Sequence, residues 1–133
     1  MILFPFQTCH AEDSPAGHCV WYGECNERNG LNQNCPYNGT AKPLLPEAAV
    51  SLLKKRCPHL VNQTGVTSTC CSFDQLKTLD RSIELAANFL NRCPSCMKNF
   101  MRIICDYTCS HDHSNYVEIV NITKNPTTGK CSH

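Results

Sequence analysis

The chain has 133 residues with 12 basic and 11 acidic side chains, so its net charge is close to zero. No basic stripe is present to follow phosphates, which argues against nucleic-acid binding. No stretch reaches the ~20 apolar residues that a membrane-spanning helix needs. The 12 cysteines predict a disulfide scaffold of up to six bridges, which requires an oxidising compartment and excludes an ordinary cytosolic enzyme.

In chain order, residues 1–18 are expected to be an irregular lead-in. The apolar start from Met1 to Phe6 is either the remnant of a signal peptide or simply a chain end. Residues 19–133 are interpreted as the N-terminal part of one domain, because the sequence stops at His133 without a natural boundary. Between Cys19 and Cys35 the composition indicates short loops or strands held by disulfides, and residues 42–46 form an extended, proline-stiffened connector.

Three helices follow from apolar spacing and helix-end signals. Pro46 suits the first turn of a helix that ends near Arg56. The strongest helix begins at Ser72, which has the form of a capping box with Gln75, and its apolar residues recur at three- and four-residue steps as far as Leu90.

Cys93-Pro94 ends that helix and starts the next one. The apolar face of this last helix carries Met97, Phe100, Met101 and Ile104. Beyond Ser110 the pattern fades, and the weak alternation over 116–120 predicts a short strand.

Three N-glycosylation sequons add to the evidence for secretion. Their acceptors are Asn38, Asn62 and Asn121, each followed two positions later by a threonine. One such tripeptide is common by chance, but three of them in a cysteine-rich chain predict a lumenal or extracellular location.

The cysteines themselves carry the most specific pattern. Cys70 and Cys71 are adjacent and seldom bond to each other, because a disulfide needs its Cα atoms about 5.5 Å apart in a particular geometry. They are therefore expected to bond two different distant segments.

Further signals are the run Cys19-Val20-Trp21-Tyr22-Gly23-Glu24-Cys25, then Asn34-Cys35, the segment from Cys70 to Leu76, and Arg92-Cys93-Pro94-Ser95-Cys96. Together, these segments closely resemble the N-terminal domain of the Niemann-Pick type C cholesterol transporters. The resemblance runs from about Cys19 to Ser110. It implies a small disulfide-rich α+β fold with about three helices and short strands, related to the folate-receptor-like scaffold.

The same resemblance implies a function. The family's domain is a lumenal, non-enzymatic module that binds one cholesterol or related sterol in a deep pocket and needs no cofactor. It is the first domain of a multi-pass membrane protein, so the membrane would be reached through spans downstream of this chain. A small soluble lumenal carrier hands it the sterol, at the late endosome–lysosome or the plasma membrane.

Two amides are implied to hold the sterol's 3β-hydroxyl. They correspond to Asn34 and Gln75, and an amide suits a hydroxyl because it offers both a donor and an acceptor. Gln75 has a rival interpretation as a helix-capping residue. The implied pocket wall comprises Trp21, Glu24, Leu79, Ser82, Ala86, Met97 and Ile104. Ser82 stands where the family has asparagine and Ala86 where it has proline, while Met97 and Ile104 replace phenylalanines.

The resemblance also implies the bridges Cys19–Cys70, Cys25–Cys35, Cys57–Cys105 and Cys71–Cys109. The family partners of Cys93 and Cys96 lie further downstream than this chain extends, and Cys9 and Cys131 have no counterpart. Much of the family's pocket wall would also lie downstream. The 133 residues alone are therefore expected to bind sterol weakly or not at all.

Some of the same residues suggest other functions. Cys93-Pro94-Ser95-Cys96 resembles a redox motif, but no βαβ pattern surrounds it. Histidines such as those of His111-Asp112-His113 suggest a zinc site, but they are scattered and the cysteines are expected to be oxidised. The sequence contains neither a paired set of acidic residues nor a nucleophile elbow that would suggest catalysis. A folate- or riboflavin-receptor-like vitamin binder and a disulfide-rich protein-interaction module remain as alternatives.

Overall fold

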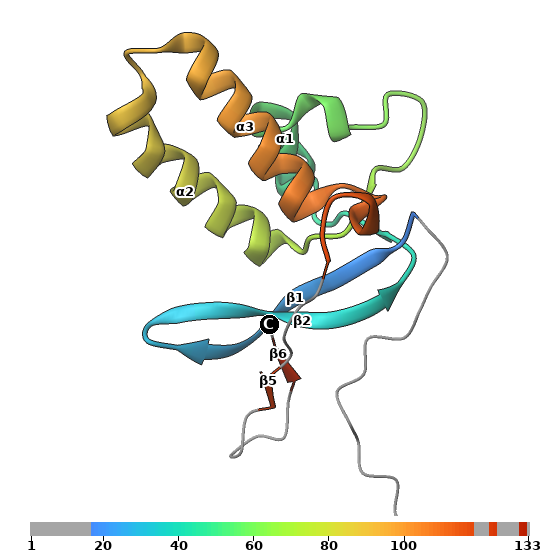
Figure 1. The fold of residues 1–133 in the computed structure, drawn as a ribbon. Helices are drawn as coiled ribbons and strands as arrows, with labels where there is room; N and C mark the ends of the chain where they lie inside the picture. Colours follow the sequence, from blue (N-terminus) through green and yellow to red (C-terminus); the bar gives the residue numbers. More distant parts are fainter. Residues whose placement is uncertain (1–16, 119–122, 125–130, 133) are drawn as a thin grey trace, which may run out of the picture.

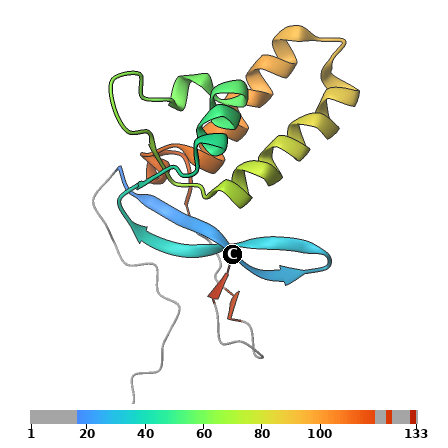
Figure 2. The ribbon, with the colours of Figure 1, turned by 180° about the vertical axis from the view of Figure 1, so that it is seen from behind.

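The computed structural model describes residues 17–118, 123–124 and 131–132, with side chains for 17–118. A long β-hairpin, formed by β1 (Cys19–Arg28) and β2 (Leu31–Gly39), lies on one side of a group of three helices. Figures 1 and 2 show the helices α1 (Glu47–Arg56), α2 (Phe73–Leu90) and α3 (Pro94–Cys109) together over one face of this hairpin. The prediction of a disulfide-rich α+β fold is confirmed.

The hairpin strands, of 10 and 9 residues, are longer than the expected short loops or strands, although their pairing shifts register at three points in β1. β1 and β2 pair antiparallel, with Arg28 opposite Leu31 across a two-residue turn. Asn29 and Gly30 form this turn with φ of 54° and 77°. Positive φ at both central positions is the requirement of the tight hairpin turn that Asn-Gly favours. The Asn29-Gly30 dipeptide is therefore a signal that could have predicted the hairpin.

The segment after the hairpin contains two very short strands and the first helix. β3 (Lys42–Pro43) pairs antiparallel with β4 (Ser68–Thr69). Pro46 is the residue before α1, which ends at Arg56 as predicted. A 3₁₀ turn, η1 (Pro58–Leu60), follows. A last antiparallel pair joins β5 (Thr123–Lys124) to β6 (Cys131–Ser132).

The capping box at the start of α2 is present as predicted. The Ser72 hydroxyl accepts a hydrogen bond from the backbone N–H of Gln75, and the Gln75 side chain accepts one from the backbone N–H of Ser72. These bonds satisfy N–H groups that the first helical turn leaves without partners. The predicted start of α3 is confirmed as well, with Pro94 as its first residue.

The predicted strand over 116–120 is wrong for its described part. Residues 116–118 contain no strand, and 119–120 lie outside the described residues. The chain instead makes a 3₁₀ turn, η2 (His113–Asn115), and the N–H groups of Tyr116 and Val117 both bond the His113 carbonyl. These donors are therefore used inside a turn and are not available to a neighbouring strand.

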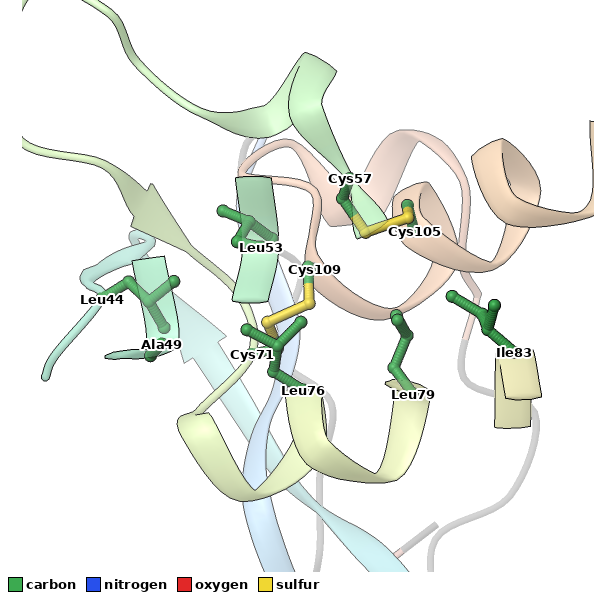
Figure 3. Close-up of a cluster of buried hydrophobic side chains, with 10 residues drawn as sticks. All are labelled: Leu44, Ala49, Leu53, Cys57, Cys71, Leu76, Leu79, Ile83, Cys105 and Cys109. Atoms are coloured by element: carbon green, nitrogen blue, oxygen red, sulfur yellow. A yellow bond between two sulfur atoms is a disulfide. The ribbon is translucent and has the colours of Figure 1, made fainter. Parts of the chain in front are cut away.

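The hydrophobic core lies among the three helices. Figure 3 shows its buried members, which are Leu44, Ala49, Leu53, Cys57, Cys71, Leu76, Leu79, Ile83, Cys105 and Cys109. Two disulfides, Cys57–Cys105 and Cys71–Cys109, cross this core. They link α3 to the end of α1 and to the start of α2, so the helices are joined covalently where they pack.

The other bridges involve the hairpin and the start of α3. Cys19–Cys70 joins the beginning of β1 to the segment before α2, and Cys25–Cys35 crosses the hairpin. With the two core bridges, these are the four pairs that the family resemblance implies. Cys93 forms a disulfide with Cys96 in the same turn. This differs from the resemblance, which implies that both cysteines pair with partners further downstream. Three residues of separation in the first turn of a helix bring the two sulfurs within bonding reach.

Candidate functional site

Gln75 lies where the hairpin meets the first turn of α2. Its side chain is 2% exposed, and Oε1 accepts hydrogen bonds from the backbone N–H of Gly23 at 2.7 Å and of Ser72 at 2.9 Å. The amide nitrogen Nε2 donates to Oδ1 of Asn34 at 2.9 Å. Two backbone donors on one side of the amide fix its orientation, so the nitrogen must face Asn34.

Asn34 comes from the middle of β2, opposite Glu24 of β1. It is half-buried, and 41 residues separate it from Gln75 in the chain. The capping box sets the position of Gln75, and the hairpin register sets that of Asn34. The structure therefore brings together the two amides for which the resemblance implies a common ligand.

Glu24 continues this polar cluster along α2. Its Oε1 accepts a hydrogen bond from the Thr78 hydroxyl at 2.8 Å, and its Oε2 accepts one from Nδ2 of Asn32 at 3.0 Å. Thr78 was missed in the sequence, although it follows Gln75 by three positions and so shares its side of the helix. One carboxylate oxygen thus joins the hairpin to α2, and the other joins β1 to β2 within the hairpin.

Trp21 and Leu79 have a packing role. Trp21 is 5% exposed, and its ring meets those of Tyr107 and His113 edge-on, with centroids 5.0 and 4.3 Å apart. Edge-to-face contact is a favourable arrangement for aromatic rings. Leu79 belongs to the hydrophobic core. These two residues hold the hairpin and α2 in place beside the amide pair.

His113, the partner of Trp21, is fully buried. Its Nδ1 accepts a hydrogen bond from the backbone N–H of Val20 at 3.3 Å, so the ring proton is on Nε2, which donates to the Tyr107 carbonyl. This histidine therefore joins β1 to α3 and η2. Within the described residues, no group of three or more His, Cys, Asp or Glu side chains could hold a metal ion.

Ser82 and Ala86 are half-buried on α2. They follow Gln75 by seven and eleven residues, and so lie along its side of the helix. The Ser82 hydroxyl donates to the Thr78 carbonyl at 3.0 Å. Leu85 and Phe89, which the sequence analysis did not single out, extend the same side and are 66% and 82% exposed. Apolar side chains are thus exposed towards the end of α2, and the polar Thr78 and Ser82 lie between them and Gln75.

A second exposed apolar surface is found on α3. Ile103 and Tyr107 are 69% and 50% exposed and lie one turn apart. Tyr107 touches Trp21, so this side of α3 faces the hairpin. Ile104 is half-buried against the core. Met97 lines a different groove, near the end of α1.

The two sequons in the described part differ in their surroundings. Asn38 is exposed in β2. Asn62 is exposed in the loop after η1, where its Oδ1 accepts hydrogen bonds from the N–H and the hydroxyl of Thr64. Asn121 lies outside the described residues. Exposure of both acceptors is compatible with glycosylation, which stays a prediction.

Two shifted pKa values occur away from the amide pair. Burial, followed by the neighbouring Tyr37, raises the pKa of Tyr22. A hydrogen bond from the Ser110 hydroxyl lowers the pKa of Asp112 below its usual 3.8, and burial opposes this effect. Neither group points to acid–base chemistry at the site.

Within residues 17–118, no helix is long and apolar enough to cross a membrane. The fold and the site together define a disulfide-rich α+β domain in which two amides from distant segments meet and apolar side chains of α2 and α3 are exposed. Sites for small molecules are in general mostly apolar with a few placed polar groups.

The family follows from comparison with known proteins. The family described as Niemann-Pick C1 N terminus matches residues 16–131, and the chain belongs to it. NPC intracellular cholesterol transporter 1 of Sus scrofa is 42% identical over 102 residues, which are 76% of this chain and 8% of that protein. The NPC1-like intracellular cholesterol transporter 1 of Mus musculus is 34% identical over 82% of the chain, and that of Homo sapiens 30% over 90%. The chain spans about a tenth of the length of these relatives.

Proposed function

We propose that the chain forms the hydroxyl-reading part of a sterol-binding site in a non-enzymatic sterol transporter, on the lumenal or extracellular side of a membrane. The observation that carries the proposal is the contact between Gln75 and Asn34, in a fold that exposes apolar side chains further along α2 and on α3. The relatives, which are named as cholesterol transporters, support the choice of cholesterol or a related sterol as the ligand.

The existing hydrogen bonds of the amide pair determine which amide would donate to the sterol hydroxyl and which would accept from it. Oε1 of Gln75 already accepts two hydrogen bonds, whereas Nε2 has a second N–H beyond the one given to Asn34. A hydroxyl can accept from this N–H and donate to Oδ1 of Asn34. One sterol hydroxyl would thereby bind both amides, and the capping role of Gln75 would be undisturbed because it uses the oxygen.

The apolar sides of α2 and α3 would contact the body of the sterol. Ser82, Ala86 and Phe89 follow Gln75 along α2, and Ile103 and Tyr107 are exposed on α3. Burial of such side chains against a ligand contributes roughly 25 cal/mol per Å² of apolar surface. Transfer of the sterol from a soluble carrier towards a membrane belongs to the proposed role of the longer protein.

The test is equilibrium binding of radiolabelled cholesterol to the secreted chain, and to a version extended downstream along its gene. Epicholesterol, whose 3-hydroxyl has the opposite configuration, should compete poorly. Gln75→Glu keeps the oxygen that caps α2 but removes the donor. It should weaken cholesterol binding by about 5- to 150-fold, the equivalent of one lost hydrogen bond of about 1–3 kcal/mol.

Asn34→Ala should also weaken binding, because it removes the Oδ1 that accepts from Gln75 and would accept from the sterol hydroxyl. Asn99→Ala is the matched control, since Asn99 is exposed on α3 and the variant removes the same amide elsewhere. Circular dichroism of each variant shows whether the fold is retained. Absence of saturable binding by both lengths of the chain, with disulfides intact, would contradict the proposal.

A further inference from the structure

A groove separate from the amide pair lies between α3 and the end of α1. Its volume is about 510 Å³, within the roughly 300–1,000 Å³ of small-molecule pockets. Its apolar lining includes Pro58, Pro94, Met97 and Met101. Unbranched methionine side chains adapt to ligands of irregular shape, as a flexible acyl chain would require.

The groove also has four basic side chains, and carboxylates of the protein already engage two of them. Arg56 forms ion pairs with Asp80 at 2.6 Å and Glu84 at 3.6 Å. His59 contacts Asp106 at 2.7 Å. The acidic groups nearest to these two are therefore already engaged.

Lys98 and Arg102 have no ion-pair partner within 4 Å among the described residues, and both line the groove. They are four residues apart on α3, so two like charges face each other along one side of the helix, an arrangement that disfavours the helix slightly. A ligand anion between them would relieve this repulsion and gain charge-assisted hydrogen bonds.

We infer that this groove binds the anionic form of a fatty acid, with the carboxylate between Lys98 and Arg102 and the chain along Met97 and Met101. The apolar lining disfavours a free inorganic anion, which would gain nothing from it. The concave shape favours a single ligand molecule over the flat surface of a bilayer. A sterol carries no charge and would leave both cations unpaired.

The groove and the amide pair face different parts of the molecule. Arg102 and Lys98 lie near Cys105, whose bridge to Cys57 holds α3 against the end of α1. Ile103 and Tyr107 point to the other side, where Tyr107 meets Trp21 of the hairpin. Fatty-acid binding is therefore expected to be independent of the proposed sterol site.

Isothermal titration of the full 133-residue chain with monomeric laurate tests the inference. Laurate should bind, and dodecanol, which has the same chain length without the charge, should bind at least about 10-fold more weakly, equivalent to 1.4 kcal/mol. The double variant Lys98→Gln/Arg102→Gln should weaken laurate binding by a similar factor. Lys54→Gln/Lys55→Gln is the matched control, because it removes two exposed cations of α1 that do not line the groove, and it should leave the affinity unchanged.

Four results would overturn the inference. They are absence of laurate binding, equal binding of dodecanol, equal loss in the control variant, and displacement of laurate by cholesterol at one shared site. Binding to phosphatidylglycerol vesicles without binding of monomeric laurate would show that the ligand is an anionic membrane surface and not a fatty acid. The readout needs no sterol binding, so failure of the proposed function leaves this test intact.

Discussion

Gln75 bonds three segments through one amide. Its oxygen accepts from the start of α2 and from Gly23 of β1, and its nitrogen donates to Asn34 of β2. Removal of this amide would leave two partly buried backbone N–H groups without an acceptor. Each would cost about 1–3 kcal/mol of folding free energy. The fold therefore depends on the oxygen of Gln75, whereas a ligand would use the nitrogen, and substitutions can separate the two roles.

At the same scale, Asp112 supplies a prediction about pH. The Ser110 hydroxyl donates a hydrogen bond to its carboxylate and lowers its pKa below 3.8, and Asn115 adds a second bond at 3.3 Å. A carboxyl whose pKa is lower in the folded state stabilises the fold above its unfolded pKa. This contribution is lost as the pH falls through the folded value.

We expect Ser110→Ala to raise the pKa of Asp112 towards its ordinary value, because the largest cause of the shift is removed. An NMR titration of the Asp112 side-chain carboxyl between about pH 2 and 6 measures the change. Asn115→Ala should produce a smaller rise in the same direction. An unchanged Asp112 pKa in Ser110→Ala would show that the hydroxyl is not the cause.

At the scale of elements, the helices could be predicted because their signals are local. Ser72 and Gln75 are three residues apart, and Pro94 marks the start of α3 in the chain itself. The strand expected over 116–120 failed because η2 is set by a distant contact, the burial of His113 against β1. A weak alternation of residue types cannot reveal such a contact.

The candidate site also depends on contacts between distant segments, which local sequence patterns do not reveal. Family resemblance implies that Asn34 and Gln75 share a ligand, but residue spacing alone could not bring them together across 41 positions. The connecting element is the β1–β2 hairpin, whose register near its tip is set by the turn at Asn29 and Gly30. The bond between Thr78 and Glu24 depends on the same element and was missed with it.

The turn can be tested directly. Gly30 has φ of 77° with open space around its Cα, so Gly30→Ala introduces no clash but places an L-residue in the left-handed region. The cost is about 1 kcal/mol. We expect exchange of the backbone amides over 26–33 to become about fivefold faster.

Hydrogen–deuterium exchange of the hairpin provides this measurement, with Gly65→Ala as the control. Gly65 has no positive φ, and an added Cβ would be at an ordinary 3.6 Å from Nδ2 of Asn62. Its substitution should leave the hairpin amides unchanged. Equal protection in both variants would mean that the turn does not limit opening of the hairpin.

At the scale of the whole molecule, disulfides provide much of the packing that a chain of this size lacks. The core contains four cysteines among its ten buried members, and the bridges Cys19–Cys70, Cys57–Cys105 and Cys71–Cys109 span 51, 48 and 38 residues. Several large apolar side chains, among them Phe89 and Ile103, stay exposed. Covalent links that restrict the unfolded chain therefore compensate for apolar surface that the described fold does not bury.

The bridges should differ in their contribution to stability. Closure of the 38-residue loop between Cys71 and Cys109 is worth about 4 kcal/mol in the chain-entropy description, whereas the bridge between Cys93 and Cys96, three residues apart, is worth under about 2 kcal/mol. Cys71 and Cys109 are also fully buried, so their replacement by alanine leaves a cavity in the core. We therefore expect Cys71→Ala/Cys109→Ala to destabilise the chain far more than Cys93→Ala/Cys96→Ala.

Unfolding in guanidinium chloride measures this difference, because the single tryptophan, Trp21, is buried and reports on the contact between the hairpin and α3. Each double variant leaves no unpaired cysteine from its own bridge, so disulfide exchange does not obscure the result. Equal losses of stability in the two variants would mean that loop length and burial do not determine what each bridge contributes. A larger loss in Cys93→Ala/Cys96→Ala would place the weakest point of the fold at the start of α3, where the Cys93 sulfur accepts the N–H of Cys96 and so caps the helix.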